Sequence, residues 1–561
     1  MKIFAMKPGH DGAIALVDAA SGKLEWSFEP EKDSFRRYEV FNPSQFVFAA
    51  EQLGAMPDVF AVSGWSKGAI AANAPIGAGY YGHGSGAVQH HRTTMFGANV
   101  NYFSSSHERS HIWCGYGLSP FEQGKPCYVL AWEGALGDFY LVDEKLDVHH
   151  VGRVMITPGG KYAFLYALAD PTFTLPKGKL RNEDPGKLMA LCAYGKSGEM
   201  APDEREITDF LLERDSILAT LSKDDLRESK YYNIGLQHPD FTRLAKRYSD
   251  EIFNRFYLYA KAHLTKGYPL LISGGCGLNC DWNTMWRNSR LFEDVFVPPC
   301  TNDTGSAIGT AIDAMREFTG RAKLEWSVYS DRAFIDDQPD MSDVDTYSLD
   351  LGHVADYLAQ DNIVAWTQGR CEIGPRALGN RSILAAPFAR STCDRLNRIK
   401  KREGFRPVAP ICLEEEVSRH FDWTGPSPHM LYFQKVRNPE LAAITHVDGT
   451  ARVQTVNTQQ NPRMHALLTQ FSARTGSGVL CNTSLNFNGT GFINRTSDLY
   501  RYCKTTGVDG FVYDDRFCVI RKEAPTRRPE GLSCDGRLPL RPRGLCQSGE
   551  VVTSTAKERK K

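Results

Sequence analysis

Residues 362–387 read NIVAWTQGRCEIGPRALGNRSILAAP. This stretch opens with the short apolar run NIVAWT, which is typical of a buried strand, and passes into a glycine-containing turn. The runs CYVLAWE near residue 130 and YPLLISGG near residue 272 follow the same pattern, and the amphipathic stretch DEIFNRFYLYAKAHL lies between those two. Because strands alternate with helical stretches, the sequence predicts an α/β fold.

The turn that follows NIVAWT carries Arg370, Arg376 and Arg381 among three glycines and a proline. Guanidinium groups on a loop whose backbone a ligand can approach closely suit bidentate binding of phosphate. Ordinary solvated arginines on a surface loop are the alternative. The residues by themselves leave both interpretations open.

Length and charge set the general class of the protein. The chain has 561 residues, and its 66 Lys and Arg are balanced by 66 Asp and Glu. A single hydrophobic core stops growing well before this length, so two or three domains are expected. The balanced charge gives no general indication of a nucleic acid, a membrane surface or a highly charged substrate.

The cysteines and the N-terminus predict a cytoplasmic protein. The fourteen cysteines are scattered, with Cys276 and Cys280 closest together, so they are interpreted as reduced thiols. The apolar stretch in MKIFAMKPGHDG is too short for a signal peptide. No apolar run reaches the roughly 18 residues that a membrane span needs.

Composition divides the chain into three parts. Residues 1–345 begin with a predicted hairpin, KIFAMK, AIALVD and LEWSFEP, and an acidic stretch near 320–350 predicts a linker. Residues 351–522 hold their own strands and glycine-containing turns. Residues 523–561 form a predicted disordered, basic tail, with nine Lys and Arg against four Asp and Glu after Ala524.

A candidate metal site centres on SSSHERSHIW. His107 and His111 are four residues apart, so a helix would place both imidazoles on one face, and Ser105 with Glu108 fits a capping box that would start this helix. Asp303, in PPCTNDTGSAIG, and Glu133, in LAWEGALGD, could add oxygen ligands. Hydrogen-bonded histidines and turn-capping acids remain the alternatives.

Two further turns carry candidate functional residues. His10 and Asp11 lie in PGHDG, where a histidine could accept a proton from an attacking hydroxyl near neutral pH. An Asx-type turn is the alternative. The segment GGCGLN, with Gly274, Gly275 and Asn279, follows a predicted strand and would let a phosphate approach the backbone, although it is neither a Walker A nor a GxGxxG motif.

The segments GHDGAIAL, HERSH, GKLMALCAYG, GGCGLN and NDTGSAIG occur in this order, and together they resemble the first domain of the NodU/CmcH O-carbamoyltransferases. The resemblance implies an actin/Hsp70-like domain, similar to the tRNA threonylcarbamoyl-transferring protein. It implies that His107, His111 and Asp303 hold a metal, usually iron, with Glu133 where the family often has Asp. It also places His10 and Asp11 at the transfer site, and Gly274, Gly275 and Asn279 beside a nucleotide.

The second part of the chain resembles the YrdC-like domain of the same family. The resemblance rests on GPRALGNRSILA, IKKREGFRPVAP, ITHVDGTARVQTV and CNTSLNFNG. It implies that this domain condenses carbamoyl phosphate with ATP, and the many negative charges of these two ligands call for Mg²⁺ as well. The implied contacts are Arg370, Arg376, Lys400, Arg402, Arg406, Arg452, Ser484 and Asn486, with His446 and Asp448 nearby.

These features predict an ATP-dependent O-carbamoyltransferase that forms carbamoyl adenylate in the second domain and transfers the carbamoyl group in the first. KPGHDGAIAL and EPEKDSFRRY resemble the 3-hydroxymethylcephem branch, typical of antibiotic biosynthesis, so a primary hydroxymethyl of a small metabolite is the expected acceptor. The alternatives are a hydroxymethylated nucleobase in nucleic acid, which the basic tail favours, tRNA threonylcarbamoylation, and a non-catalytic nucleotide sensor. The oligomeric state is left open.

Overall fold

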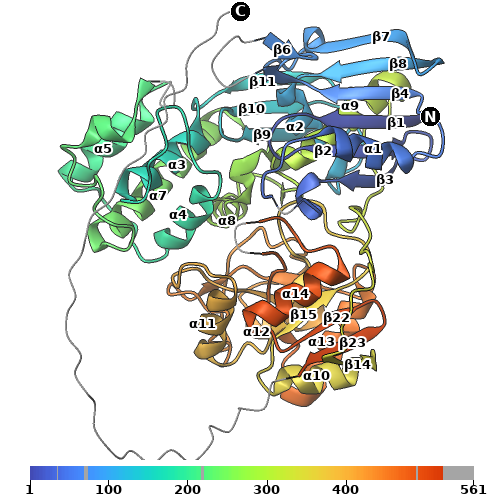
Figure 1. Cartoon of the computed structure of the whole chain (residues 1–561). Coiled ribbons are helices and arrows are strands. Elements are labelled where there is room, and N and C mark those ends of the chain that lie inside the picture. Colours follow the sequence, from blue (N-terminus) through green and yellow to red (C-terminus); the bar gives the residue numbers. More distant parts are fainter. Residues whose placement is uncertain (35, 68–73, 216–219, 488–489, 522–561) are drawn as a thin grey trace, which may run out of the picture. The chain divides into compact units, whose positions relative to one another are not determined.

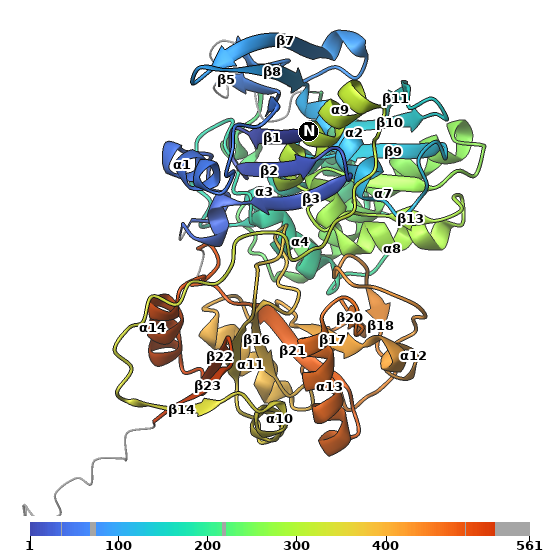
Figure 2. The ribbon, with the colours of Figure 1, turned by 90° about the vertical axis from the view of Figure 1, so that its right-hand side faces the viewer.

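The computed structural model describes residues 1–34, 36–67, 74–215, 220–487 and 490–521 (Figures 1 and 2). The predicted basic tail at 523–561 lies outside the described residues. Within the described part, helices and strands alternate in mixed α/β layers, which confirms the predicted fold class. No described helix is long and apolar enough to cross a membrane.

The first sheet has six strands in the order β3-β2-β1-β4-β8-β7. The predicted N-terminal hairpin is confirmed, because β1, β2 and β3 pair antiparallel in sequence order. Side chains alternate along β1, so that Ile3 and Ala5 face one core and Phe4 faces another. The strands are β1 (Lys2–Lys7), β2 (Ala13–Asp18), β3 (Lys23–Phe28), β4 (Val59–Ser63), β7 (Val88–Met95) and β8 (Ala98–Ser105).

The second sheet has five strands in the order β11-β10-β9-β12-β13. The predicted strands in CYVLAWE and YPLLISGG are confirmed as β9 and β12, which pair parallel at its centre. The strands are β9 (Cys127–Trp132), β10 (Gly137–Val142), β11 (Val148–Arg153), β12 (Leu270–Ser273) and β13 (Val295–Phe296).

Helices α2 (His107–Leu118) and α9 (Ser306–Thr319) pack against each other between these two sheets, with α9 on the six-stranded sheet and α2 on the five-stranded one (Figure 2). Glycine allows their close approach, because a Cβ added at Gly309 would lie 1.8 Å from the backbone oxygen of Ser110. The two helices are therefore fixed relative to each other near their N-terminal turns. The 3-10 turn η5 (Asp303–Gly305) leads directly into α9.

Other helices cover the outer faces of both sheets. The predicted helix in DEIFNRFYLYAKAHL is confirmed as part of α7, whose Phe256 packs on Trp132 of β9. The elements are α1 (Pro43–Glu51), α3 (Pro158–Ala169), α4 (Asp184–Cys192), α5 (Pro202–Leu212), α7 (Pro239–His263), α8 (Cys280–Ser289), η1 (Pro30–Lys32), η2 (Ser85–Ala87), η3 (Lys223–Leu226), η4 (Gly275–Leu278) and the hairpin β5 (Trp65–Lys67) and β6 (Ala74–Ile76).

Residues 344–520 build a mixed eight-stranded sheet in the order β14-β23-β22-β15-β16-β21-β17-β20. The predicted strand in NIVAWTQG is confirmed as β15, where Ala365 faces one core and Trp366 the opposite one. The strands are β14 (Val344–Ser348), β15 (Val364–Thr367), β16 (Arg381–Ala385), β17 (Ala409–Leu413), β20 (Gln454–Val456), β21 (Val479–Ser484), β22 (Gly510–Tyr513) and β23 (Arg516–Ile520).

Helices lie on both faces of the eight-stranded sheet (Figures 1 and 2). Helices α10 and α13 share one core cluster with Trp366, and α11 and α14 share the other with Ala365. The elements are α10 (Leu351–Ala359), α11 (Arg390–Ile399), α12 (Val417–His420), α13 (Pro462–Thr475), α14 (Thr496–Thr506), η6 (Glu414–Glu416) and the two-stranded pair β18 (Gln434–Lys435) and β19 (Thr450–Ala451).

The predicted start of the histidine helix is confirmed, but its predicted cap is wrong by one residue. Ser106, not Ser105, accepts the backbone N–H of Arg109 through its side chain. Ser105 pairs with Val88 as the last residue of β8, so the sheet fixes its position. The carboxylate of Glu108 accepts hydrogen bonds from the N–H of Gly82, at 2.7 Å, and from the hydroxyl of Tyr140. It therefore does not bond to the backbone at the start of the helix.

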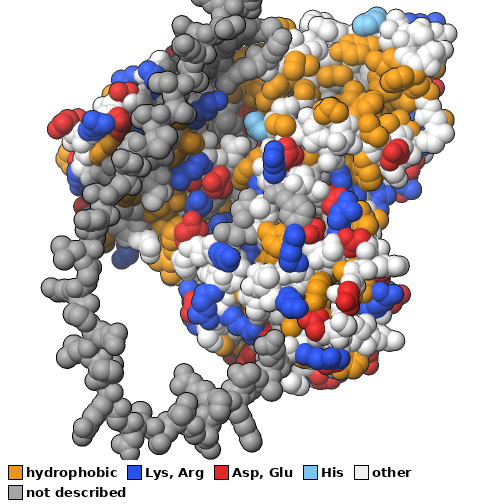
Figure 3. Space-filling view, viewed as in Figure 1, with side chains coloured by type: hydrophobic (Ala, Val, Ile, Leu, Met, Phe, Trp, Pro, Cys, Tyr) orange, Lys and Arg blue, Asp and Glu red, His pale blue; other side chains and the backbone are white. Residues whose placement is uncertain are grey.

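Charged side chains of both signs are interspersed on the face of the molecule that Figure 3 shows, and hydrophobic side chains gather over the part that holds the six-stranded sheet. The cysteines of the described residues are buried.

Replacing Gly309 by Ala should destabilise the fold, because the added Cβ would overlap the backbone of Ser110. Overpacking of this kind costs about 1–3 kcal/mol. The control is Gly186→Ala in α4, where an added Cβ meets nothing within 4 Å. Thermal unfolding should give a lower midpoint for Gly309→Ala and an unchanged or slightly higher midpoint for Gly186→Ala. Equal midpoints for the two variants would contradict the steric argument.

Candidate functional site

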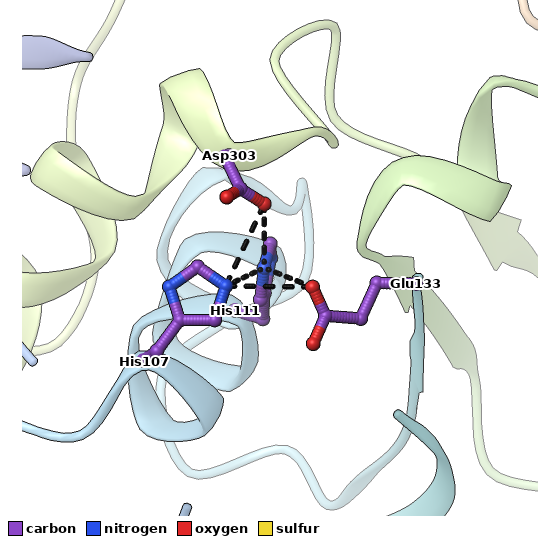
Figure 4. Close-up of side chains that lie close together, drawn as sticks. All are labelled: His107, His111, Glu133 and Asp303. Atoms are coloured by element: carbon purple, nitrogen blue, oxygen red, sulfur yellow. Dashed lines mark hydrogen bonds and ion pairs between the residues drawn. The ribbon is translucent and has the colours of Figure 1, made fainter. Parts of the chain in front are cut away.

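Four buried side chains meet at the first candidate site. His107 and His111 project from the first turns of α2, Glu133 follows β9, and Asp303 begins η5 (Figure 4). Their ligand atoms all lie within 4.8 Å of one another. The structure therefore brings together all four side chains that the sequence analysis singled out as metal ligands.

The distances within this cluster fit a metal ion. The Nε2 atoms of His107 and His111 are 3.1 Å apart, and each lies 3.4–3.5 Å from Glu133 Oε2 and from Asp303 Oδ1. Ligand atoms that surround one ion tetrahedrally at 2.0–2.2 Å are about 3.3–3.6 Å apart. Two imidazole nitrogens and two carboxylate oxygens form a donor set that first-row transition metals accept.

The protonation of the cluster follows from its charges. Burial alone would lower the pKa of His111, but hydrogen bonds to Asp303 and Glu133 raise that pKa to about 10. Burial alone would raise the pKa of Glu133, but the two histidines lower it to about 2. Without a metal, His111 is thus cationic and both acids are anionic at neutral pH.

His10 lies beside this cluster. Its Nδ1 is 2.8 Å from Asp11 Oδ2 and 3.9 Å from Asp303 Oδ2, and 48% of its side chain is exposed. Asp11 adopts a left-handed backbone (φ 50°) and accepts a hydrogen bond from Asn302. Burial alone would lower the pKa of His10, but the hydrogen bond to Asp11 and the charge of Asp303 raise it. Solvent-accessible His10 can therefore exchange a proton next to the cluster.

A second candidate site is a cavity lined by arginines. Four of the predicted contacts, Arg376, Arg402, Arg406 and Arg452, line it together with His446 and Asp448, and residues of α4 close it from the first half of the chain. Its volume of about 120 Å³ is below the range typical of whole small-molecule sites. The cavity therefore suits an anionic group of a ligand.

The cations of this cavity are poorly neutralised. Burial lowers the pKa of Arg376 to about 9, and the nearby charge of Arg452 contributes. Burial and the charge of Arg406 lower the pKa of Arg402 to about 9 as well. Among the described residues, only Arg406 of the four has a carboxylate in ion-pair range, that of Glu403 at 3.8 Å. Half-buried guanidinium groups without a carboxylate partner are typical of a site for an anionic ligand.

Lys400, Ser484 and Asn486 form a separate hydrogen-bonded group. Lys400 Nζ donates to the backbone oxygen of Ser484 at 2.5 Å and to the side-chain oxygen of Asn486, which also accepts the Ser484 hydroxyl at 2.7 Å. Burial, with the charges of Arg402, Arg37 and Arg406, holds the pKa of Lys400 well below its usual range. The positive charges of the arginines in and near the cavity therefore act on Lys400 as well.

Arg370 and Arg381 take up other positions. Arg370 donates to the backbone oxygens of Ser330 and Asp331, and Arg381 is fully buried and donates to the backbone oxygens of Gln368, Gly369 and Asn380. Neither side chain lines the arginine cavity. Both arginines therefore use their guanidinium groups to bind backbone oxygens of the protein.

The segment from Gly274 to Asn279 lies between the two sites. A Cβ at Gly274 (φ 107°) would lie 2.4 Å from the backbone oxygen of Trp132 and 2.9 Å from Glu133 Cβ. At the other end, the backbone oxygen of Leu278 accepts a hydrogen bond from Arg376. Asn279 caps α8 through its side chain, and Gly275 is exposed.

The Arg376 loop is anchored to the first half of the chain at Gly374. Lys32 Nζ donates to its oxygen and its N–H donates to Glu29, both at 2.5 Å. Gly374 has φ 83°, and a Cβ there would lie 2.3 Å from the backbone oxygen of Pro299. Only glycine fits this conformation and this space together.

Two family profiles and several relatives match this chain. The profile described as "Carbamoyltransferase N-terminus" matches residues 93–312, and "Carbamoyltransferase C-terminus" matches residues 355–521. A 3'-hydroxymethylcephem-O-carbamoyltransferase of Streptomyces clavuligerus is 46% identical over 517 residues, which are 92% of this chain and 98% of that protein. The chain belongs to the carbamoyltransferase family. It is a carbamoyl-transferring enzyme, as the NodU/CmcH resemblance predicted, and a non-catalytic sensor is set aside.

More distant carbamoyltransferase relatives cover the same length. Nodulation protein U of Bradyrhizobium diazoefficiens is 32% identical over 580 residues, which are 94% of this chain and 99% of that protein. Among solved structures, the Lmo2764 protein of Listeria monocytogenes aligns over 56% of this chain and 99% of its own, with 14% identity and a TM-score of 0.26. A TM-score of this size assigns no fold to the carbamoyltransferase.

Sequence reasoning missed three residues around these sites. Arg37 contributes charge to the arginine cluster from the first half of the chain, and Lys7 and Tyr80 contact the two acids of the metal cluster. The only signal for Lys7 is a lysine at the end of an otherwise apolar strand, and for Arg37 the basic pair in SFRRYEV. Tyr80 lies in a loop with no such signal.

Adding a divalent transition metal to the metal-free enzyme should release about one proton at pH 7, because ligand imidazoles must be neutral and His111 is protonated up to pH about 10. Metal affinity should then rise about tenfold per pH unit between pH 6 and 8. Calorimetric titrations in buffers of different ionisation enthalpy measure the released proton directly. Affinity that is independent of pH over this range would show that His111 is not a ligand.

Proposed function

We propose that this carbamoyltransferase condenses carbamoyl phosphate with ATP in its second half and transfers the resulting carbamoyl group to an acceptor hydroxyl beside His10. The observation that supports the first step is the cavity lined by Arg376, Arg402, Arg406 and Arg452. These cations lack sufficient partners in the protein, and carbamoyl phosphate and a triphosphate would bring several negative charges to them.

In this proposal the neutral donors near the arginines bind the carbamoyl group. Ser484 and Asn486 carry a hydroxyl and an amide within reach of Lys400, and such groups can recognise a carbamoyl amide without adding charge. Mg²⁺ would accompany the triphosphate. With one water consumed, the products would be carbamoyl adenylate, pyrophosphate and inorganic phosphate, and the later transfer to the hydroxyl would release AMP.

The first half of the chain would carry out transfer. His10 would accept the proton of the acceptor hydroxyl, and Asp11 would orient its imidazole through the 2.8 Å hydrogen bond. His107, His111, Glu133 and Asp303 would hold a transition metal, and iron is our assignment from the family resemblance. When bound, such an ion acts as a Lewis acid that polarises a carbonyl.

The segment from Gly274 to Leu278 supports the coupling of both steps. It contacts Glu133 at one end and Arg376 at the other, so the two sites share one wall. Gly274, Gly275 and Asn279 would lie along the path of the nucleotide. A shared, enclosed path would protect a reactive adenylate from water.

We further propose that residues 1–345 have an actin/Hsp70-like fold and residues 351–522 a YrdC-like fold. The pair of sheets that enclose α2 and α9 supports the first assignment. The acceptor would be a primary hydroxymethyl of a small metabolite. This inference rests on the Streptomyces clavuligerus relative, whose name specifies a hydroxymethylcephem.

Arg452→Ala should abolish pyrophosphate release, because it removes a cation that would bind the phosphates. Ser484→Ala combined with Asn486→Ala should do the same.

His107→Ala should remove the metal and reduce transfer severely, yet leave pyrophosphate release intact. His10→Ala should keep its metal and lose about 10²- to 10⁴-fold in transfer. Metal content, pyrophosphate and carbamoylated product are measured on the same folded preparations.

The matched control for these variants is Arg474→Ala, which removes an arginine of the same half that pairs with Asp356 outside the cavity. It should retain both activities. If His107→Ala lost pyrophosphate release in parallel with transfer, the two-site scheme would be wrong. Normal pyrophosphate release from Arg452→Ala would remove the assignment of the cavity.

An acceptor screen by mass spectrometry should detect one added carbamoyl group on a 3-hydroxymethylcephem and none on hydroxymethylated DNA or tRNA. The screen compares the full chain with a chain that ends at Ala524, which should transfer equally well to the small acceptor. Carbamoylation of hydroxymethylated DNA that depends on the residues after Ala524 and weakens with salt would instead establish a nucleic-acid acceptor.

A further inference from the structure

The two acids of the metal cluster each use one oxygen toward the histidines. Glu133 Oε2 and Asp303 Oδ1 lie 3.4–3.5 Å from the Nε2 atoms of His107 and His111. The second oxygen of each carboxylate is engaged elsewhere. Glu133 Oε1 accepts the Tyr80 hydroxyl at 2.8 Å, and Asp303 Oδ2 lies 2.9 Å from Lys7 Nζ.

Lys7 is held firmly in this position. It is the last residue of β1, and its side chain is fully buried. Its ammonium also donates to the backbone oxygen of His10 and lies 4.1 Å from the centre of the Trp65 ring. A buried ammonium is costly unless it is paired, so the ion pair with Asp303 fixes both groups.

Tyr80 is held by the helix that carries the histidines. The backbone N–H groups of His107 and Glu108 donate to the oxygens of Gly79 and Tyr80 at 3.1 and 3.0 Å. The Tyr80 ring lies 4.4 Å from the His107 ring. The hydroxyl therefore points at Glu133 from a backbone that the first turn of α2 positions.

We propose that Lys7 and Tyr80 are positioning residues that make Asp303 and Glu133 bind the metal through one oxygen each. An acid whose second oxygen is held by a neighbouring donor turns that oxygen toward the ion less readily. The metal would then have two nitrogen and two oxygen ligands from the protein, and its further positions would stay open for a reactant. This inference rests on the metal site of the proposed function.

The Tyr80 hydroxyl also restrains a long side chain. Glutamate has one more methylene than aspartate, and its carboxylate can rotate more freely. The Tyr80 hydroxyl at 2.8 Å restricts that rotation. The hydroxyl of Tyr80 therefore holds the carboxylate of Glu133 in one orientation.

Cobalt(II) titration of the metal-free enzyme tests this proposal, because its visible absorbance is strong at four-coordinate and weak at six-coordinate sites. Tyr80→Phe and Lys7→Met should each bind cobalt about 10- to 100-fold more weakly than the unchanged chain. Their bound absorbance should also weaken as a released carboxylate oxygen enters the coordination sphere. Thermal midpoints establish that each variant is folded, and Tyr80→Phe, which removes a single oxygen, carries the test if Lys7→Met does not fold.

The matched controls are Tyr81→Phe, next to Tyr80 but 60% exposed, and Lys2→Met, on the same strand as Lys7 but paired with Glu25. Both should titrate like the unchanged chain. Tyr80→Phe with unchanged affinity and absorbance would overturn the positioning role. Failure of the unchanged chain to bind cobalt more tightly than His107→Ala would instead overturn the metal site itself, so the two failures are distinguishable.

Discussion

The close contact between α2 and α9 at Gly309 determines the geometry on which the metal cluster depends. Both histidines belong to the first turns of α2, and Asp303 lies just before α9. A side chain at position 309 would meet the backbone of Ser110, between the two histidines in sequence. The glycine thus lets backbone approach backbone, and the imidazoles and the carboxylate come within 3.5 Å as a result.

The two sites handle buried charge in opposite ways. In the first, two acids are balanced by Lys7 and by a protonated His111, so the protein supplies most of the compensation itself. In the second, Arg376, Arg402 and Arg452 are half-buried with no carboxylate in ion-pair range among the described residues, and loss of contact with water lowers the pKa of the first two. Uncompensated charge destabilises a protein unless a ligand supplies the missing sign. Under the proposed function, the phosphates of carbamoyl phosphate and ATP would supply that sign in the second half of the chain.

Local sequence patterns predicted what depends on neighbouring residues in the chain. Apolar runs predicted the strands β1, β9, β12 and β15, and a capping-box pattern predicted the helix that carries His107 and His111. Glu133 and Asp303 were candidates from their positions in glycine-containing turns, and the family resemblance supported them as ligands. The cap of α2 was placed one residue early because strand pairing, which is not local, determines the position of Ser105.

Contacts between distant segments could not be predicted in this way. Tyr80 reaches Glu133, and Arg37 reaches the arginine cluster, only after folding brings separate loops together. The sequence suggests that Arg370 and Arg381 bind a ligand, because arginines that bind phosphate often lie in glycine-containing loops. Arginines that bind carbonyl oxygens of the protein lie in the same kind of loop. Which of the two occurs depends on the carbonyls that the tertiary fold presents, here those of Ser330, Asp331 and Gln368.

Gly374 restricts which sequences the two halves of the chain can combine. It precedes the arginine loop of one half and touches the backbone of Pro299, just before the segment that carries Asp303 in the other. A bulkier residue could be accommodated only if residues 299–300 moved away, and the metal ligand that follows would move with them. A substitution at this seam must therefore fit both halves of the chain at once. Hybrid enzymes assembled from halves of distant relatives would have to match at this seam before their active sites could match.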